Sequence, residues 1–118
     1  MSIRVLIVDD HAGFRALARE VLERHGFDVV AEAADGASAL RAAEASRPDV
    51  VLLDVQLPDA NGFDVADALV APVEPPLVVM TSTRDLSDLG SRLERSSARG
   101  FIPKSRLSGA ALEELVRR

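Results

Sequence analysis

The sequence predicts an α/β fold in which a doubly wound, five-stranded parallel sheet is flanked by five helices. Short runs of Val, Ile and Leu alternate five times with longer segments, most of them amphipathic, and parallel strands require such crossover helices between them. The apolar residues are mostly Ala, Val and Leu, with four Phe and no Trp or Tyr, which is typical of buried strands covered by helices. One hydrophobic core is therefore expected.

The first strand and helix are indicated by a change of hydrophobic period. Residues Ile3–Val8 are largely apolar and β-branched, as in a strand buried on both faces. Apolar residues then recur at helical spacing before a stop signal at Gly26; they are Phe14, Leu17, Ala18, Val21 and Leu22. An amphipathic helix is therefore predicted after the strand.

The second strand and helix lie between a turn signal and a proline. Asp28–Ala33 predicts a short strand, and Asp35-Gly36 predicts a turn that opens an Ala-rich helix from about residue 37 to residue 46. Pro48 disfavours helical geometry in the residue before it, so the helix is expected to end at Arg47.

The third and fourth strands are predicted at the apolar runs Val50–Leu53 and Leu77–Met80. A loop over residues 57–62 and a short helix over Phe63–Val70 are expected between them. Three prolines then interrupt the chain before the fourth strand, at Pro72, Pro75 and Pro76.

The last two helices are predicted from their caps. Asp85 is expected to cap a helix over residues 86–97, with Leu89 and Leu93 on its inner face. Gly100–Pro103 then predicts the fifth strand, and Ser108 the cap of the final helix. Strand and helix thus alternate five times along the chain.

Composition and charge argue against several classes of protein. Because the chain has no cysteine, it cannot contain a disulfide framework, a thiol nucleophile or a zinc ribbon. The formal net charge of -5 at pH 7 argues against direct binding to nucleic acid, which usually needs a concentrated positive surface. The first apolar run is too short for a signal sequence or a membrane span. We therefore expect one cytoplasmic domain over residues 1–118, with no output domain and no membrane or direct nucleic-acid contact.

Chemically active side chains follow four of the predicted strands. They are Asp9 and Asp10 after the first, Asp54 after the third, Thr81 and Ser82 after the fourth, and Lys104 after the fifth. In open parallel sheets ligands bind beyond the carboxyl ends of the strands, so these side chains are expected to converge. Taken singly, an aspartate at a strand end is more often a helix cap, and a threonine there is an ordinary strand residue. Their coincidence favours a functional site.

The three aspartates indicate a divalent cation. Two unit charges about 4 Å apart repel by roughly 4 kcal/mol at the effective dielectric of a protein surface, so crowded carboxylates need compensation. Mg²⁺ suits one or two carboxylates, several waters and a phosphate oxygen, whereas Ca²⁺ needs more protein ligands. Lys104 would add a point charge for phosphate. The sequence therefore predicts a Mg²⁺ site with a positive charge that suits a phosphate group beside it.

Four short motifs occupy these strand ends. They are Val8-Asp9-Asp10, Leu53-Asp54 followed by Pro58 and Gly62, Met80-Thr81-Ser82, and Gly100-Phe101-Ile102-Pro103-Lys104. Over the whole chain, this set resembles the receiver domain of two-component response regulators. The resemblance implies a flavodoxin-like receiver fold with strand order 2-1-3-4-5. It also implies a phosphorelay switch in which Asp54 accepts a phosphoryl group from a sensor histidine kinase, a phosphotransfer protein or a small acyl phosphate.

The resemblance also implies a ligand set for the metal. Asp10 and, less directly, Asp9 would hold Mg²⁺ together with Asp54 and the backbone carbonyl of Gln56. The side chains of Gln56 and Thr83 would influence the lifetime of the phosphoryl group. Such a domain assists its own phosphorylation and dephosphorylation but is not an enzyme.

A conformational switch is the second implication of the resemblance. Lys104 and the hydroxyl of Thr81 would contact the phosphoryl oxygens; counting back from Lys104 makes Ser82 the alternative to Thr81. Movement of Thr81 would let Phe101 repack the face formed by the fourth helix, fifth strand and fifth helix. Gly90 should lower the stability of the fourth helix by about 1 kcal/mol relative to Ala. A loosely held helix suits a switch that works by a population shift, but the same residue equally fits an exposed helix of low stability with no role in a switch.

Other functions fit the residues less well. An aspartyl-nucleophile phosphatase would need an acid where Gln56 stands, and no glycine-rich phosphate loop follows the first strand. The remaining alternative is a pseudo-receiver that is never phosphorylated and serves as a protein-interaction module. His11 is expected to face solvent, and His25 to lie at a helix end. The kinase, the downstream target or missing output domain, and homodimer formation on phosphorylation are left open.

Overall fold

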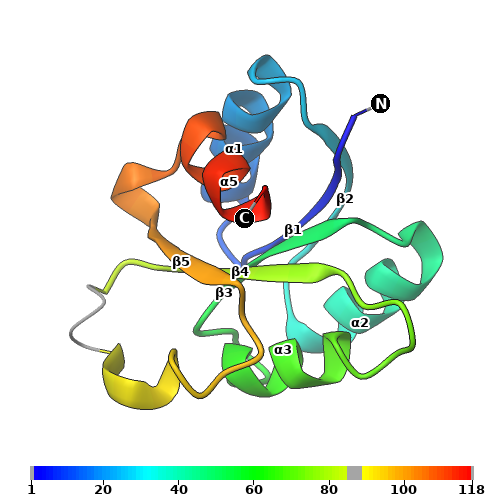
Figure 1. The fold of residues 1–118 in the computed structure, drawn as a ribbon, viewed down its shortest axis with the longest axis vertical. Helices are drawn as coiled ribbons and strands as arrows, with labels where there is room; N and C mark the ends of the chain where they lie inside the picture. Colours follow the sequence, from blue (N-terminus) through cyan, green and yellow to red (C-terminus); the bar gives the residue numbers. More distant parts are fainter. Residues whose placement is uncertain (1, 85–88, 118) are drawn as a thin grey trace.

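The five strands form one parallel sheet. The computed structural model describes residues 2–84 and 89–117 (Figure 1). The strands are β1 (Arg4–Val8), β2 (Asp28–Ala33), β3 (Val50–Asp54), β4 (Leu77–Ser82) and β5 (Gly100–Pro103). All neighbouring pairs are parallel and the order is β2-β1-β3-β4-β5, which confirms the predicted topology.

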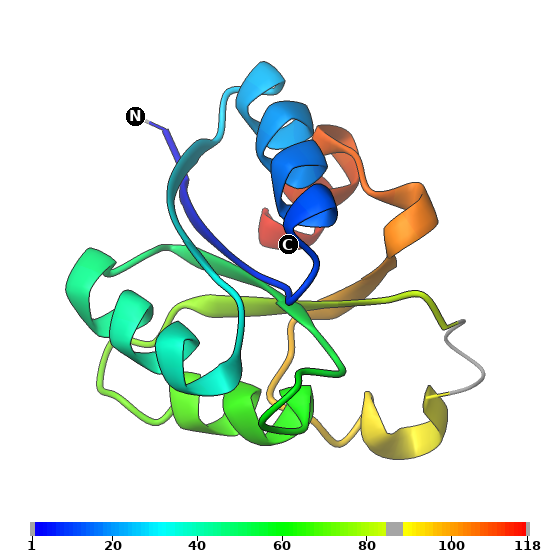
Figure 2. The same cartoon turned by 180° about the vertical axis from the view of Figure 1, so that it is seen from behind.

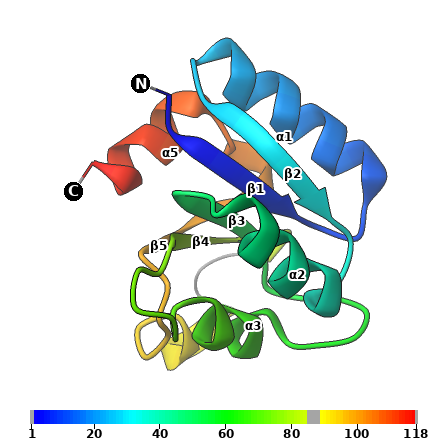
Figure 3. The same ribbon diagram turned by 90° about the vertical axis from the view of Figure 1, so that its right-hand side faces the viewer.

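Helices cover both faces of this sheet. Those in the described parts of the chain are α1 (Ala12–Arg24), α2 (Gly36–Ser46), α3 (Gly62–Leu69) and α5 (Gly109–Val116), with 3-10 turns η1 (Gly90–Arg92) and η2 (Lys104–Arg106). Figures 2 and 3 show α1 and α5 on one face, and α2 and α3 on the other. None of these helices is long and apolar enough to cross a membrane.

Strand alternation divides the core into two clusters. Along β1, Leu6 and Val8 pack toward α2 and α3, whereas Val5 and Ile7 pack toward α1 and α5. The side chains of β3 are buried along its whole length. Because β3 is buried on both faces, its position is fixed, and so is the position of Asp54 at its carboxyl end.

Several predicted boundaries are confirmed by their local chemistry. Asp35 caps α2 by accepting a hydrogen bond from the Ser38 amide at 2.8 Å. That helix ends at Arg47, whose φ of 47° lies in the left-handed region immediately before Pro48. Ser108 caps α5 by accepting from the Ala111 amide at 3.0 Å.

The predicted fourth helix is wrong in its extent. Asp85 and residues 86–88 lie outside the described residues. Leu89 is α-helical, but residues 90–97 contain only the short turn η1 instead of a continuing α-helix. Gly90 adopts a φ of 58°, a conformation that ends α-helical geometry and favours glycine. The segment is instead held against α3, where Arg92 lies 5.0 Å from the Phe63 ring centre. Leu89 is nevertheless buried, as predicted.

Candidate functional site

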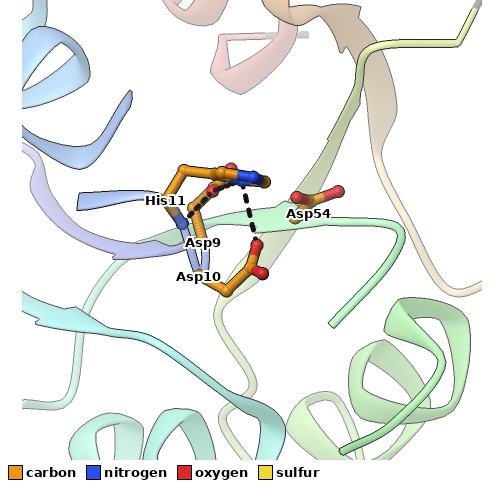
Figure 4. A group of neighbouring side chains, drawn as sticks. All are labelled: Asp9, Asp10, His11 and Asp54. Atoms are coloured by element: carbon orange, nitrogen blue, oxygen red, sulfur yellow. Dashed lines mark hydrogen bonds and ion pairs between the residues drawn. The ribbon is translucent and has the colours of Figure 1, made fainter. Parts of the chain in front are cut away.

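The carboxyl edge of the sheet carries the acidic cluster. Asp9, Asp10 and His11 follow β1, and Asp54 is the last residue of β3 (Figure 4). One ligand atom from each of these four side chains lies within 4.8 Å of the others. The structure therefore brings together the three aspartates that the sequence predicted to converge.

The acids differ sharply in burial. Asp9 is 0% exposed and Asp54 is 5% exposed, whereas Asp10 faces solvent. The amide of His11 donates to Asp9 Oδ1 at 2.8 Å, and the amide of Gln56 donates to Asp54 Oδ1 at 3.1 Å. Each buried carboxylate is thus oriented by the backbone two residues further on. Asp10 remains the accessible carboxylate of the pair that follows β1.

Lys104 links the two buried carboxylates. Its Nζ lies 2.6 Å from Asp9 Oδ2 and 3.0 Å from Asp54 Oδ2. Burial raises the pKa of Asp54, against the lowering effect of the Gln56 amide and the Lys104 ammonium. Burial alone would lower the pKa of Lys104, but its hydrogen bonds to Asp9 and Asp54 raise it overall. One ammonium therefore compensates two carboxylates.

Two residues of α1 complete this arrangement, and the sequence did not indicate either role. The Nζ of Lys104 lies 4.7 Å from the centre of the Phe14 ring, a cation–π contact. Arg15 Nη1 donates to the carbonyl of Asp9 at 2.7 Å. Helical periodicity placed Phe14 among the apolar positions of the predicted helix. Neither the contact to Lys104 nor the bond to Asp9 can be found from spacing within α1.

The two candidate hydroxyls on β4 have different surroundings. Thr81 pairs with Asp54 across the β3–β4 ladder, is 1% exposed, and its Oγ1 has no hydrogen-bond partner within residues 2–84 and 89–117. Ser82 Oγ accepts from the Arg84 amide at 3.0 Å and lines the cleft beside Asp54. Register favours Thr81 and cleft lining favours Ser82, so both stay candidates for the phosphate contact.

Phe101 lies on β5, three residues before Lys104, but it does not pair with Thr81 in the sheet. It pairs with Met80 and packs, half-buried, against the α2–α3 cluster, whereas Thr81 pairs with Ile102. Ile102 belongs to the opposite cluster. The structure thus places the predicted switch pair on adjacent strands, with Phe101 one position before the residue that pairs with Thr81.

A cleft of about 320 Å³ opens at this edge of the sheet. Its lining includes Asp10, Asp54 and Lys104, and the loop residues Gln56, Pro58 and Thr83 border it. The predicted modulators of phosphoryl lifetime, Gln56 and Thr83, therefore lie where a group on Asp54 would be found. The cleft is open to solvent.

The two histidines have acidic neighbours. His11 is exposed as predicted, and its Nδ1 lies 3.0 Å from Asp10 Oδ1. His25 is the C-cap of α1, where its Nε2 lies 2.6 Å from Glu113 Oε1 of α5. The hydrogen bonds from His25 and Arg117 lower the pKa of Glu113.

The donor set of the cluster suits a hard divalent cation. Asp10 and Asp54 offer carboxylate oxygens, and the backbone carbonyl of Gln56 belongs to the loop that borders the same cleft. Oxygen ligands of this kind, with room for water, are those that Mg²⁺ prefers. The residues present therefore fit Mg²⁺.

Comparison with known proteins gives one consistent result. A family model described as the response regulator receiver domain matches residues 5–117. The chain is 42% identical over 104 residues to the DNA-binding response regulator MtrA of Mycobacterium tuberculosis, covering 88% of this chain and 45% of MtrA. It is 36% identical over 101 residues to the transcriptional regulatory protein PdtaR of the same organism, covering 86% of this chain and 49% of PdtaR. The chain thus spans about half the length of these curated relatives.

Solved structures agree with this result. The signal receiver domain of the putative response regulator NarL from Mycobacterium tuberculosis has a TM-score of 0.89 and 32% identity, with 98% of this chain and 97% of that chain covered. The response regulator domain of Thermotoga maritima CheB has a TM-score of 0.84 and 29% identity, with 99% and 95% covered.

Proposed function

Because the chain belongs to the response regulator receiver domain family, we propose that it is a phosphorylation-switched signalling domain whose Asp54 accepts a phosphoryl group. One observation carries the proposal. The ammonium of Lys104 lies between the carboxylates of Asp9 and Asp54, at the edge of a solvent-open cleft. This arrangement keeps a nucleophilic carboxylate oriented and supplies positive charge where phosphoryl oxygens would arrive.

The proposed metal ligands are Asp10, Asp54 and the Gln56 carbonyl, with Asp9 contributing more indirectly. Asp9 has one oxygen on the His11 amide and the other on Lys104, so its charge supports the site while Asp10 remains accessible. When bound, Mg²⁺ would offset the carboxylate charge and orient the phosphoryl oxygens.

The proposed reaction transfers a phosphoryl group to a carboxylate oxygen of Asp54. A new P–O bond forms while the P–N bond of a kinase phosphohistidine, or the P–O bond of a small acyl phosphate, breaks. The leaving imidazole or carboxylate departs with the bonding electrons. Lys104 already contacts Asp54 Oδ2 and can follow the charge onto the phosphoryl oxygens, and a β4 hydroxyl can donate a further hydrogen bond.

The partners follow from this chemistry. We propose a sensor histidine kinase or phosphotransfer protein as donor in the cytoplasm, and a downstream protein or a separate output domain as receiver of the signal. Dimer formation on phosphorylation would use the face of β5 and α5. Any contact with DNA would come from an output domain, since the chain's net charge is -5.

The central test is the mass of the intact protein after incubation with a small acyl phosphate and Mg²⁺. The wild-type chain should gain one phosphoryl group, and chelation of Mg²⁺ should suppress the gain. Asp10→Asn should weaken Mg²⁺ affinity by at least roughly tenfold, because the loss of a group that only orients a metal ligand already costs about 10–100-fold. Unchanged affinity in Asp10→Asn would remove Asp10 from the site. Absence of any wild-type adduct, together with no complex with beryllofluoride, would favour the pseudo-receiver.

The switch gives a separate prediction. Phosphorylation should shift the NMR signals around Phe101, and the shift should be smaller in Thr81→Ala than in wild type. The reason is that the buried Thr81 hydroxyl makes no hydrogen bond within the described residues, so it is available to bond a phosphoryl oxygen. Ser82→Ala is the matched control on the same strand. If Ser82→Ala reduces the response and Thr81→Ala does not, Ser82 is the switch hydroxyl. Equal responses in all three proteins would exclude coupling through either residue.

A further inference from the structure

The loop after β3 is fixed to the start of α2. Asp59, at the tip of this loop, accepts hydrogen bonds from the Gly36 amide at 2.7 Å and from the Ala37 amide at 3.1 Å. The first amides of a helix have no partner within the helix, so a carboxylate placed there is stabilised by both the bonds and the helix dipole. Asp35 takes the next amide, that of Ser38, at 2.8 Å. Two aspartates from different parts of the chain thus share one helix end.

The contact is close because residue 36 is glycine. A Cβ built on Gly36 would lie 3.2 Å from Asp59 Oδ1, 3.2 Å from the Cβ of Ala60 and 3.1 Å from Cγ2 of Val65. Each of these distances is shorter than an ordinary van der Waals contact. The backbone of Gly36 therefore lies directly against side chains of the loop and of α3.

The same loop borders the proposed site. Gln56 and Pro58 line the cleft, and the Gln56 amide donates to Asp54 Oδ1. The loop is closed at its base by the bond from the Gly62 amide to the Val55 carbonyl at 2.7 Å, and across its middle by an isolated bridge between Gln56 and Asn61. The Leu57 amide donates to the Ala60 carbonyl at 3.2 Å. Asp59 adds an anchor outside the loop itself.

We propose that Asp59 is a positioning residue for phosphoryl transfer: by holding the loop tip on α2, it fixes the Gln56 backbone beside Asp54. This inference rests on the proposed function of Asp54. Asp59 does not line the cleft and would touch neither metal nor phosphate. It acts through the loop, since a tip released from α2 allows Gln56 and Pro58 to move relative to Asp54.

The competing explanation is that Asp59 only stabilises α2. Asp35→Ala is the matched control, because it removes an aspartate from the same helix end without touching the loop. If Asp59 were merely a helix cap, Asp59→Ala and Asp35→Ala would act alike on every property. If Asp59 positions the loop, only Asp59→Ala will disturb the site.

Two measurements on the full chain separate these explanations. In metal-free protein, amide hydrogen exchange at Leu57 and Gly62 should accelerate in Asp59→Ala and stay at the wild-type level in Asp35→Ala. In a titration with MgCl₂ followed by amide NMR shifts, Asp59→Ala should lose roughly tenfold in affinity, the lower end of the range for groups that orient metal ligands. Asp59→Asn keeps one acceptor oxygen and should fall between wild type and Asp59→Ala.

Each outcome decides the inference. Equal exchange and equal Mg²⁺ affinity in Asp59→Ala and Asp35→Ala would overturn it and leave Asp59 as a helix cap. If the wild-type protein fails to bind MgCl₂, the proposed function is lost, while the exchange measurement still decides whether Asp59 fixes the loop. Unchanged exchange at Leu57 and Gly62 in Asp59→Ala would exclude positioning in either case.

Discussion

Replacing Asp54 with asparagine should abolish phosphoryl transfer to this chain. The amide has nearly the same shape as the carboxylate but lacks the negative oxygen that attacks phosphorus. With a small acyl phosphate and Mg²⁺, the intact mass of Asp54→Asn should stay at the unmodified value while the wild type gains its adduct. An undiminished adduct in Asp54→Asn would assign the phosphoryl group to another residue and contradict the proposal.

The stability of Asp54→Asn supplies the control for that experiment. Burial raises the pKa of Asp54 above 3.8, so the folded protein binds this proton more tightly than the unfolded chain does. Above the pKa of Asp54 in the folded protein, ionised Asp54 lowers the free energy of unfolding. This unfavourable contribution disappears as the pH falls below 3.8, the ordinary pKa of an aspartate. Asp54→Asn should be at least as stable as wild type in urea at about pH 7, with a gain that shrinks in acid. Loss of the adduct then cannot be attributed to unfolding.

Gly62→Ala should strongly damage both the fold and the site. A Cβ on Gly62 would lie 2.7 Å from the Val55 carbonyl oxygen and closer still to the Asp54 carbonyl oxygen, so the strand end that carries the proposed phosphoacceptor must move. Overpacking against rigid backbone should lower the free energy of unfolding by roughly 2–3 kcal/mol, the upper part of the usual range. Urea denaturation measures this loss, and the rate of adduct formation should fall with it.

Gly13→Ala is the matched control for this substitution. Gly13 lies in the first turn of α1, close to the acidic cluster in sequence. Apart from its two chain neighbours and the helix's own backbone, no atom of the described residues lies within 4 Å of the position that a Cβ would take there. Alanine favours helix over glycine, so Gly13→Ala should raise stability by about 0.5 kcal/mol and leave adduct formation unchanged. A comparable loss of stability in both variants would contradict the steric explanation for Gly62.

The sequence was sufficient to predict the strands and the convergence of the acids. The strands β1 and β3 are built on continuous apolar runs, and strand ends in a parallel sheet share one edge, so Asp9, Asp10 and Asp54 meet without any further information. The extent of the fourth helix was mispredicted because hydrophobic spacing at Leu89 and Leu93 resembles one helix, whereas the positive φ of Gly90 ends helical geometry after Leu89. Periodicity does not record backbone dihedral angles.

The roles of Phe14 and Asp59 could not be predicted for a different reason. Phe14 contacts a lysine that is 90 positions later in the chain, and Asp59 caps a helix that begins 23 residues before it. Both contacts depend on how α1 and the β3–α3 loop pack on the sheet. Their sequence signals, an apolar helix position and a polar loop position, are shared by many residues without such contacts.

Lys104 also has a mechanical role in the sheet. Lys104 follows the edge strand β5, whereas the carboxylates that it contacts, Asp9 and Asp54, lie at the ends of β1 and β3. These ion pairs therefore connect the edge of the sheet to its centre. If these ion pairs couple phosphorylation at Asp54 to the structure of the β5 edge, thermodynamic linkage makes the coupling equal in both directions. A protein that binds the β5–α5 edge more tightly in the phosphorylated state must stabilise the phosphorylated state by the same factor. Under the proposed function, such a partner would raise the equilibrium extent of phosphorylation without touching the cleft at Asp54.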